Sequence, residues 1–344
     1  MDSNGKEVAT EIRPYIRVYK DGSVQRLVES PIVPPSASDP ETGVSSKDIV
    51  ISQNPPISAR IYLSKQSLQQ HQKVAVLVYF HGGAFCSGSA FSFVETKFMN
   101  RLVCLANVVA VSIEYRLAPE HLLPIAYEDC WAALQWVVSH SNRYCGSDKE
   151  PWICNYVDFD QVYVGGDSAG ANIANNILLR AGSEGLQNGV KIKGAFLTHP
   201  YFWGFKPIGS EIKDVKQREK LVMSTMWHLV YPKVAGGIDN PMINPVVEGA
   251  PSLTGLGCSR LLVSVAKKDQ VRDRGISYYN AVKESGWQGE LELIDVEGEG
   301  HSFHILVHHS ENAEKLIQRL ASFLVSCAGH GRKSFQFSSC VSRI

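Results

Sequence analysis

The chain has 344 residues, of which 44% are hydrophobic and 20% are charged, a composition typical of a folded globular protein with a large core. Lysine and arginine number 34, as do aspartate and glutamate, which excludes the basic field that draws proteins to nucleic acid or anionic membranes. We therefore expect a small-molecule substrate, and nothing in the composition indicates an oligomeric state.

The N-terminal sequence and the cysteines indicate the cellular compartment of the protein. Residues 1–14 are polar and charged and lack the apolar core of a signal peptide, and no run reaches the ~20 apolar residues of a membrane span. Eight cysteines occur without a CxxC pair, several of them inside apolar runs, which predicts buried free thiols in a reducing compartment. We expect a cytoplasmic protein.

Short apolar runs alternate with helical periodicity along the chain. The predicted strands cover residues 74–80, 108–113, 161–164, 194–198, 261–265 and 291–296. These runs are continuously apolar, which is typical of parallel strands covered on both faces. Helical spacing follows at 126–139, 170–180 and 311–325. The alternation predicts an α/β fold with a mostly parallel central sheet flanked by helices.

Two regions interrupt this alternation. Residues 22–56 are rich in Pro and Ser, and residues 201–256 are rich in Gly, Pro and aromatics with one helical stretch near 221–231. We expect a single domain over 1–325 with cap elements at about 1–56 and 201–256, and a disordered tail at 326–344. The aromatics at 202, 203 and 227 either face a flat lipophilic substrate or pack in the core.

A glycine-flanked serine follows the third predicted strand. Gly166-Asp167-Ser168-Ala169-Gly170 stands between a strand and a helix, which is the context of the G-x-S-x-G nucleophile elbow. The serine of such an elbow sits in a strained turn, where only small neighbours fit. An ordinary glycine-rich turn is the alternative, but the strand–turn–helix context favours Ser168 as a nucleophile.

A second glycine cluster follows the first predicted strand. His81, Gly82 and Gly83 come directly after residues 74–80, where bare backbone N–H groups can approach a ligand oxygen closely. We predict an oxyanion hole from this segment together with the N–H of Ala169. A Gly-Gly pair alone is more often a simple turn, but its position before the elbow favours the functional interpretation.

A nucleophilic serine needs a base and an orienting carboxylate. In the α/β-hydrolase fold both follow the serine, in loops after late strands. Asp269 follows the strand at 261–265, and His301 follows the strand at 291–296. We therefore predict a Ser168-His301-Asp269 triad, with no cofactor and no metal.

Other residues compete for these two roles. Asp273 stands where we expect a helix to have begun, so it is better placed for a cap or an ion pair. His304, His308 and His309 lie in or near a predicted helix. A zinc site from His301, His304 and His308 would lack the HExxH pattern.

From about residue 15 to 325 the sequence resembles the hormone-sensitive-lipase-like family of α/β-hydrolases, and within it the plant carboxylesterase branch. In that branch it is most similar to the 2-hydroxyisoflavanone dehydratase-like members and to the alkaloid-pathway hydrolases and cyclases. The segments that carry the resemblance are 14–22, 114–120, 126–130, 202–204, 236–241 and 272–275. It implies the same triad and oxyanion segment and a cap over the site. Ala84 departs from it, because many members have a third glycine there.

The resemblance leaves several reactions open. Ester hydrolysis follows from the triad, whereas water elimination could use His301 as a base beside a ketone, with no serine nucleophile. The dehydratases of the branch resemble one another in a threonine at the elbow, so Ser168 favours hydrolysis. The intact triad argues against the cyclase-like relatives, and His301 argues against a binding-only receptor.

Overall fold

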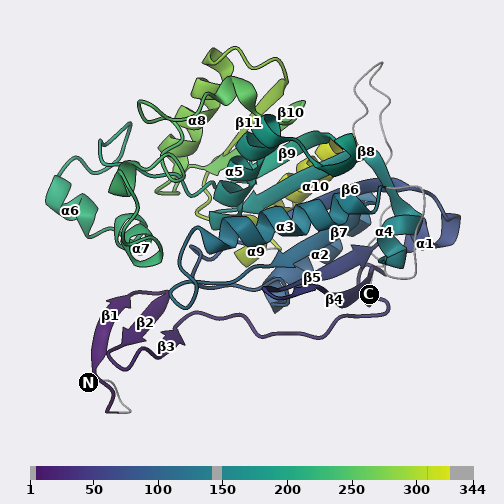
Figure 1. The fold of residues 1–344 in the computed structure, drawn as a ribbon, viewed down its shortest axis with the longest axis horizontal. Helices are drawn as coiled ribbons and strands as arrows, with labels where there is room; N and C mark the ends of the chain where they lie inside the picture. The colour runs from purple at the N-terminus through teal and green to yellow at the C-terminus, as the bar shows by residue number, and fades with distance from the viewer. Residues whose placement is uncertain (1–4, 142–148, 308, 326–344) are drawn as a thin grey trace.

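The computed structural model describes residues 5–141, 149–307 and 309–325, so the predicted tail at 326–344 lies outside the described residues. An eight-stranded sheet runs in the order β11-β10-β9-β8-β6-β7-β5-β4. The six strands from β11 to β7 are parallel, whereas β5 and β4 join antiparallel (Figure 1). The predicted α/β-hydrolase architecture is confirmed.

The bounds of the secondary structure are as follows. The strands of the large sheet are β4 (Ser45–Gln53), β5 (Pro56–Leu63), β6 (Val74–Phe80), β7 (Val109–Glu114), β8 (Val157–Asp167), β9 (Ile192–Thr198), β10 (Arg260–Ala266) and β11 (Glu290–Val296). The longer helices are α2 (Phe93–Ala106), α3 (Ile125–Ser139), α5 (Ala169–Glu184), α8 (Arg272–Glu284) and α10 (Glu311–Val325). The shorter ones are α1 (Lys65–Gln70), α4 (Pro151–Tyr156), α9 (Phe303–Leu306) and the 3₁₀ turn Gln187–Gly189. All six predicted strands are present.

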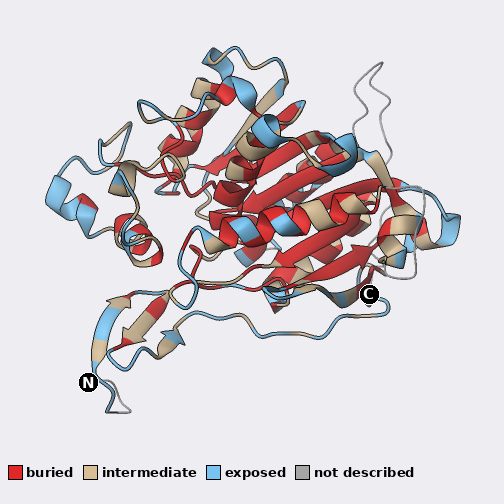
Figure 2. Cartoon of the chain, viewed as in Figure 1, coloured by how far each residue is buried: buried red, intermediate tan, exposed pale blue. Residues whose placement is uncertain are grey.

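Strand β6 shows why the runs are continuously apolar. Its side chains alternate between two cores. Val76, Val78 and Phe80 face the core under α3, α5 and α8, whereas Leu77 and Tyr79 face the core under α2 and α10. Both faces of the sheet are therefore covered by helices, and Figure 2 shows its central strands buried, whereas the edge strands β4 and β11 are only partly buried.

The N-terminal region only partly matches the prediction of irregular cap material. A separate three-stranded antiparallel sheet forms from β1 (Val8–Ile12), β2 (Ile16–Tyr19) and β3 (Val24–Arg26), and it lies beside the main body in Figure 1. Residues 45–53 were expected in the cap but form β4, the edge strand of the large sheet. That prediction is wrong because β4 combines polar residues with only a short apolar run at 49–51 and therefore does not read as a buried strand.

The insertion at 201–256 holds α6 (Val215–Glu219), α7 (Val222–Val230) and two 3₁₀ turns, Gly237–Asp239 and Leu253–Gly255. Its aromatics Phe202, Trp203 and Trp227 are at most 2% exposed and belong to the core. Of the two interpretations of these side chains, core packing is therefore the one that the structure supports.

Two further predictions concern cysteines and membranes. Cys154 is disulfide-bonded, so the prediction of free thiols is wrong for this residue, because spacing in sequence does not reveal proximity in space. Cys86, Cys104, Cys130 and Cys258 are not in disulfides. Among the described residues, no helix combines the length and the apolar character that crossing a membrane would require.

Candidate active site

Ser168 stands at a sharp turn between β8 and α5. Its backbone has φ 53° and ψ −112°, a conformation that non-glycine residues adopt rarely and mostly at functional sites. A Cβ on Gly170 would lie 1.9 Å from the Phe80 carbonyl oxygen, and one on Gly166 would lie 2.3 Å from the Gly170 carbonyl oxygen. The two glycines are therefore what allows the turn to close against β6.

Three side chains from distant parts of the chain form a hydrogen-bonded series at the carboxyl ends of the strands. His301 Nε2 lies 2.8 Å from Ser168 Oγ, and His301 Nδ1 lies 2.7 Å from Asp269 Oδ2. Asp269 follows β10, and His301 follows β11. The order hydroxyl, imidazole, carboxylate is the one that activates a serine for nucleophilic attack.

The charges of this series support one another. Burial by itself would raise the pKa of Asp269, but the neighbouring His301 and His199 hold it below its ordinary value. Burial likewise lowers the pKa of His301, yet the negative charges of Asp269 and Asp167 raise it above 6.5 overall. The His301 side chain is 29% exposed, whereas the Asp269 side chain is 3% exposed. A ligand can therefore reach the imidazole from solvent, while the carboxylate behind it is shielded.

The competing residues lie elsewhere. Asp273, in the first turn of α8, accepts the Ser210 N–H and hydroxyl, both at 2.6 Å, and forms an ion pair with Arg272. His304 is fully buried against Phe98. His308, part of the alternative zinc set, lies outside the described residues.

The loop after β6 brings backbone close to Ser168. A Cβ on Gly82 would lie 3.5 Å from Ser168 Cβ, and Gly83 has φ +108°, where a side chain would collide with the Ser87 carbonyl oxygen. Ala169 is the first residue of α5, so its N–H has no partner within the helix. Backbone donors from both segments therefore adjoin the serine.

His81 was predicted as part of the oxyanion segment, but its ring does not face the cavity beside Ser168. The imidazole is fully buried, bonds the Gly82 carbonyl oxygen at 2.7 Å and stacks on Tyr115 at 4.2 Å. Burial lowers its pKa to about 4. The His81 ring therefore fixes the loop after β6 through these two contacts, and it offers no hydrogen-bond donor to the cavity.

A cavity of about 650 Å³ opens onto Ser168 and His301, within the range of small-molecule sites. Much of its wall comes from the N-terminal segment and the start of α2. The lining includes Pro14, Tyr15, Val28, Pro31, Ile32, Gly82, Gly83, Phe93, Glu95, Ile305 and Leu306. None of the described residues of the insertion at 201–256 lines it.

Two groups near the serine were missed by sequence reasoning. Glu95 lines the cavity with 6% exposure, and its Oε2 has no hydrogen-bond partner among the described residues. Burial, together with the negative charge of Asp167, raises the pKa of Glu95 to about 8. His199 bonds Asp269 Oδ2 at 3.0 Å. His199 directly follows a predicted strand, which was a signal available in the sequence, whereas Glu95 gave none for this role.

Donor atoms of Asp167, His199 and His304 lie within 4.8 Å of one another, close enough for a shared ion. However, Asp167 already accepts hydrogen bonds from the hydroxyls of Thr198 and Ser302. We therefore assign this group no metal.

Comparisons with known proteins agree with the fold. A family model described as alpha/beta hydrolase fold matches residues 77–305. The chain is 54% identical over 324 residues, 94% of its length and 98% of the other protein, to a 2-hydroxyisoflavanone dehydratase from Glycyrrhiza echinata. It is 43% identical to probable carboxylesterase 2 from Arabidopsis thaliana, covering 94% and 98% of the two chains. A solved hyperthermophilic esterase from Pyrobaculum calidifontis superposes with a TM-score of 0.64 at 27% identity, covering 84% and 87%.

Proposed function

Because the chain belongs to the alpha/beta hydrolase family, we propose that it is a carboxylesterase that acts through Ser168, His301 and Asp269. The observation that carries this proposal is the 2.8 Å contact between Ser168 Oγ and His301 Nε2, in a series that ends on a buried carboxylate. A serine hydroxyl becomes a useful nucleophile near neutral pH when such a base takes its proton.

The reaction proceeds in two halves. Ser168 Oγ bonds to the ester carbonyl carbon while His301 Nε2 takes its proton, and Asp269 stabilises the imidazolium. The bond to the alcohol oxygen then breaks, and His301 returns the proton to the leaving alcohol. In the second half His301 takes a proton from a water molecule as its oxygen attacks the acyl carbon. The bond between that carbon and Ser168 Oγ then breaks, His301 returns the proton to Oγ, and the acid leaves.

The negative charge on the carbonyl oxygen needs donors already in place. The N–H groups of Gly82, Gly83 and Ala169 adjoin Ser168 and supply them in this proposal, and one such donor is typically worth about 3 to 4 kcal/mol in the transition state. Ala169 also begins α5, whose N-terminus carries partial positive charge toward the site.

The lining favours small lipophilic esters, including those of plant specialised metabolism. Val28, Ile32, Phe93 and Leu306 line the cavity and remain between 40% and 66% exposed. Exposed apolar side chains grouped around a cavity typically mark a binding surface. An apolar acyl or alcohol group would bury them.

Turnover of p-nitrophenyl acetate and butyrate tests the proposal. Ser168→Ala should reduce kcat by about a millionfold, as removal of a triad serine typically does. Ser183→Ala is the matched control, because Ser183 is exposed on the same helix and should leave turnover unchanged. Full activity in Ser168→Ala would refute the proposal.

Water elimination is a second candidate, favoured by Glu95. In this reaction His301 removes a proton from the carbon beside a ketone, the backbone donors hold the enolate oxygen, and the double bond forms as the hydroxyl leaves. Glu95 keeps its proton near neutral pH because its pKa is raised to about 8 by burial and by Asp167. It could give that proton to the departing hydroxyl, which leaves as water.

A 2-hydroxyisoflavanone, the substrate in the name of the relative from Glycyrrhiza echinata, separates the two candidates. If wild type shows no ester turnover, and Ser168→Ala still eliminates water from the 2-hydroxyisoflavanone at near the wild-type rate, elimination is the reaction of this site. If wild type hydrolyses esters and leaves the 2-hydroxyisoflavanone unchanged, the carboxylesterase proposal is supported.

A further inference from the structure

Asp269 accepts hydrogen bonds from two imidazoles. Its Oδ2 lies 2.7 Å from His301 Nδ1 and 3.0 Å from His199 Nδ1, while Oδ1 accepts the Val271 N–H at 3.1 Å. An ionised carboxylate only accepts, so both Nδ1 atoms carry a proton. His199 takes no part in the proton transfers described above, so its place beside the carboxylate needs another explanation.

The fold holds His199 in one position. The residue directly follows β9, and its backbone N–H donates to the Ser264 carbonyl oxygen at 2.8 Å. Its φ of 48° is left-handed, a conformation that non-glycine residues adopt rarely and that concentrates at functional sites. The fully buried ring stacks on His304 at 5.5 Å and meets the edge of Phe303 at 5.6 Å.

We propose that His199 is a positioning residue whose Nδ1–H holds Asp269 Oδ2 in line with His301 and takes up part of the carboxylate charge. The inference rests on the proposed roles of Ser168, His301 and Asp269. The Val271 N–H holds Oδ1, but the terminal torsion of an aspartate is broad, so the carboxylate can still turn about that contact and carry Oδ2 away from the imidazole. With the His199 donor also on Oδ2, that oxygen stays where His301 needs it.

If His199 takes up part of the Asp269 charge, its loss should change the pKa of His301 in a predictable direction. Asp269 stabilises the His301 imidazolium, and an added hydrogen bond to the carboxylate weakens that stabilisation. Without the His199 donor, the pKa of His301 rises further, so the base becomes neutral only at higher pH. Among the residues that the structure describes, the other titratable groups near this pair include Asp167, His304 and Tyr15.

Two substitutions separate positioning from packing. His199→Ala removes the ring and the donor, whereas His199→Asn removes the ring but keeps an N–H near the former Nδ1 and tolerates left-handed φ. For p-nitrophenyl butyrate we expect kcat/KM to fall about ten- to hundredfold in His199→Ala, the usual effect of losing a hydrogen bond to a charged group. The acid limb of its pH profile should move to higher pH, and His199→Asn should restore most of both.

Thermal unfolding of both variants reports the packing that they lose in common. If the two variants lose stability and activity equally and the acid limb stays at the wild-type pH, His199 only packs and the inference is wrong. An unchanged kcat/KM in a folded His199→Ala would also overturn it. Failure of the esterase proposal itself is distinguishable, because Ser168→Ala would then retain full activity.

Discussion

The N-terminal segment and the insertion at 201–256 differ in one respect that matters for the cavity: only the N-terminal segment presents exposed apolar side chains to it. The N-terminal segment leaves Val28 and Ile32 57% and 66% exposed beside the cavity. The insertion buries Trp203 and Trp227 to 2% or less. Apolar groups left at the rim of a cavity are free to contact substrate, so we expect the first region to govern specificity and the second to govern stability.

Their polar contacts differ in the same sense. Arg26 ties the N-terminal segment to the Cys86 carbonyl oxygen and to Glu120 at the half-exposed rim. In the insertion, Glu211 bonds both Arg218 and Arg274, and all three side chains are at most 4% exposed. A buried network with one central carboxylate makes the fold intolerant of change at that carboxylate.

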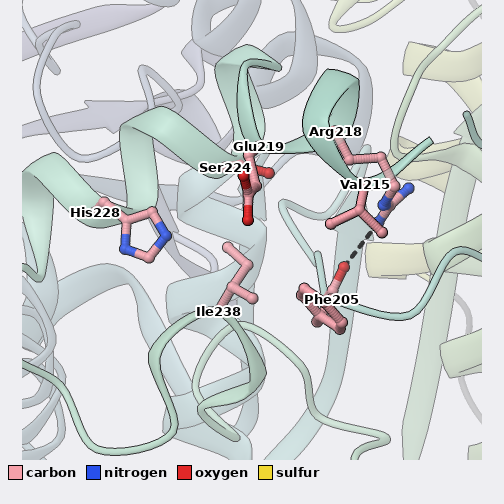
Figure 3. Close-up of a pocket in the computed structure, with 8 residues that line it drawn as sticks. Phe205, Val215, Arg218, Glu219, Ser224, His228 and Ile238 are labelled. Atoms are coloured by element: carbon pink, nitrogen blue, oxygen red, sulfur yellow. Dashed lines mark hydrogen bonds between the residues drawn. The ribbon is translucent and has the colours of Figure 1, made fainter. Parts of the chain in front are cut away.

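The insertion also has a small hollow of its own. It is about 60 Å³ in volume and is lined by residues that include Phe205, Val215 and His228. In Figure 3 Phe205 and Val215 lie beside Arg218, which bonds the Gly204 carbonyl oxygen at 2.7 Å, and His228 stands on the opposite side of the hollow. Substrate sites usually measure about 300 to 1,000 Å³, so the hollow is too small to serve as one.

Substitution of the central carboxylate should have the largest effect. Glu211→Ala leaves two buried guanidinium groups without their carboxylate partner, and we expect a loss of about 3 to 5 kcal/mol in the free energy of unfolding. Denaturant unfolding measures it. Glu219→Ala, at an exposed acid of the same insertion, should stay within about 0.5 kcal/mol. Equal losses in both variants would contradict the assignment of this region to stability.

Glu95, on the wall of the cavity, should separate the two candidate reactions. Glu95→Gln keeps the shape of the side chain but cannot transfer a proton. Any water elimination should fall by about a hundredfold or more, whereas hydrolysis of p-nitrophenyl butyrate should change little. Steady-state rates on the two substrates give the comparison. If elimination occurs and survives this change intact, Glu95 is not its acid.

The rim of the cavity should show a smaller effect, confined to long substrates. Ile32→Ser removes apolar contact with an extended acyl chain, and at ~0.8 kcal/mol per buried CH₂ we expect KM for p-nitrophenyl octanoate to rise about tenfold. The acetate ester has no such chain, so its KM should be unaffected. The matched control is Phe205→Ser, because Phe205 is 53% exposed on the insertion. A similar rise in KM for this control would break the contrast between the regions.

The sequence predicted the buried strands of the sheet because their runs are apolar on both faces, as in β6. It missed β4 and β5, and it also missed β1 to β3. The β4 sequence Ser45–Gln53 alternates between exposed and half-buried positions along much of its length. Such an edge strand resembles a loop when it is read without its neighbours.

The residues of the candidate site likewise fall into those that the sequence predicted and those that it did not. Ser168, Asp269 and His301 each follow a predicted strand, and parallel strands end at one edge, so the order of the chain brought them together. The role of Glu95 had no such signal, because Ser92 and Glu95 match a helix capping box. The Ser92 N–H instead donates to the Ser89 carbonyl oxygen. Only the fold turns Glu95 toward the cavity.

Substitutions in the N-terminal segment and in the insertion should differ least in their effect on the pH dependence of ester hydrolysis. The base must be neutral to accept the serine proton, and the pKa of His301 is raised above 6.5 because Asp269 and Asp167 outweigh the effect of burial. The acid limb of kcat/KM, which reports the free enzyme, should therefore have its midpoint above pH 6.5. Both carboxylates lie outside the two regions. Profiles of Ile32→Ser and Phe205→Ser should then coincide with that of wild type, even where KM differs. A midpoint below 6.5 in wild type would contradict the charge balance around His301, and a shift in one variant only would mean that a residue of that region contributes to it.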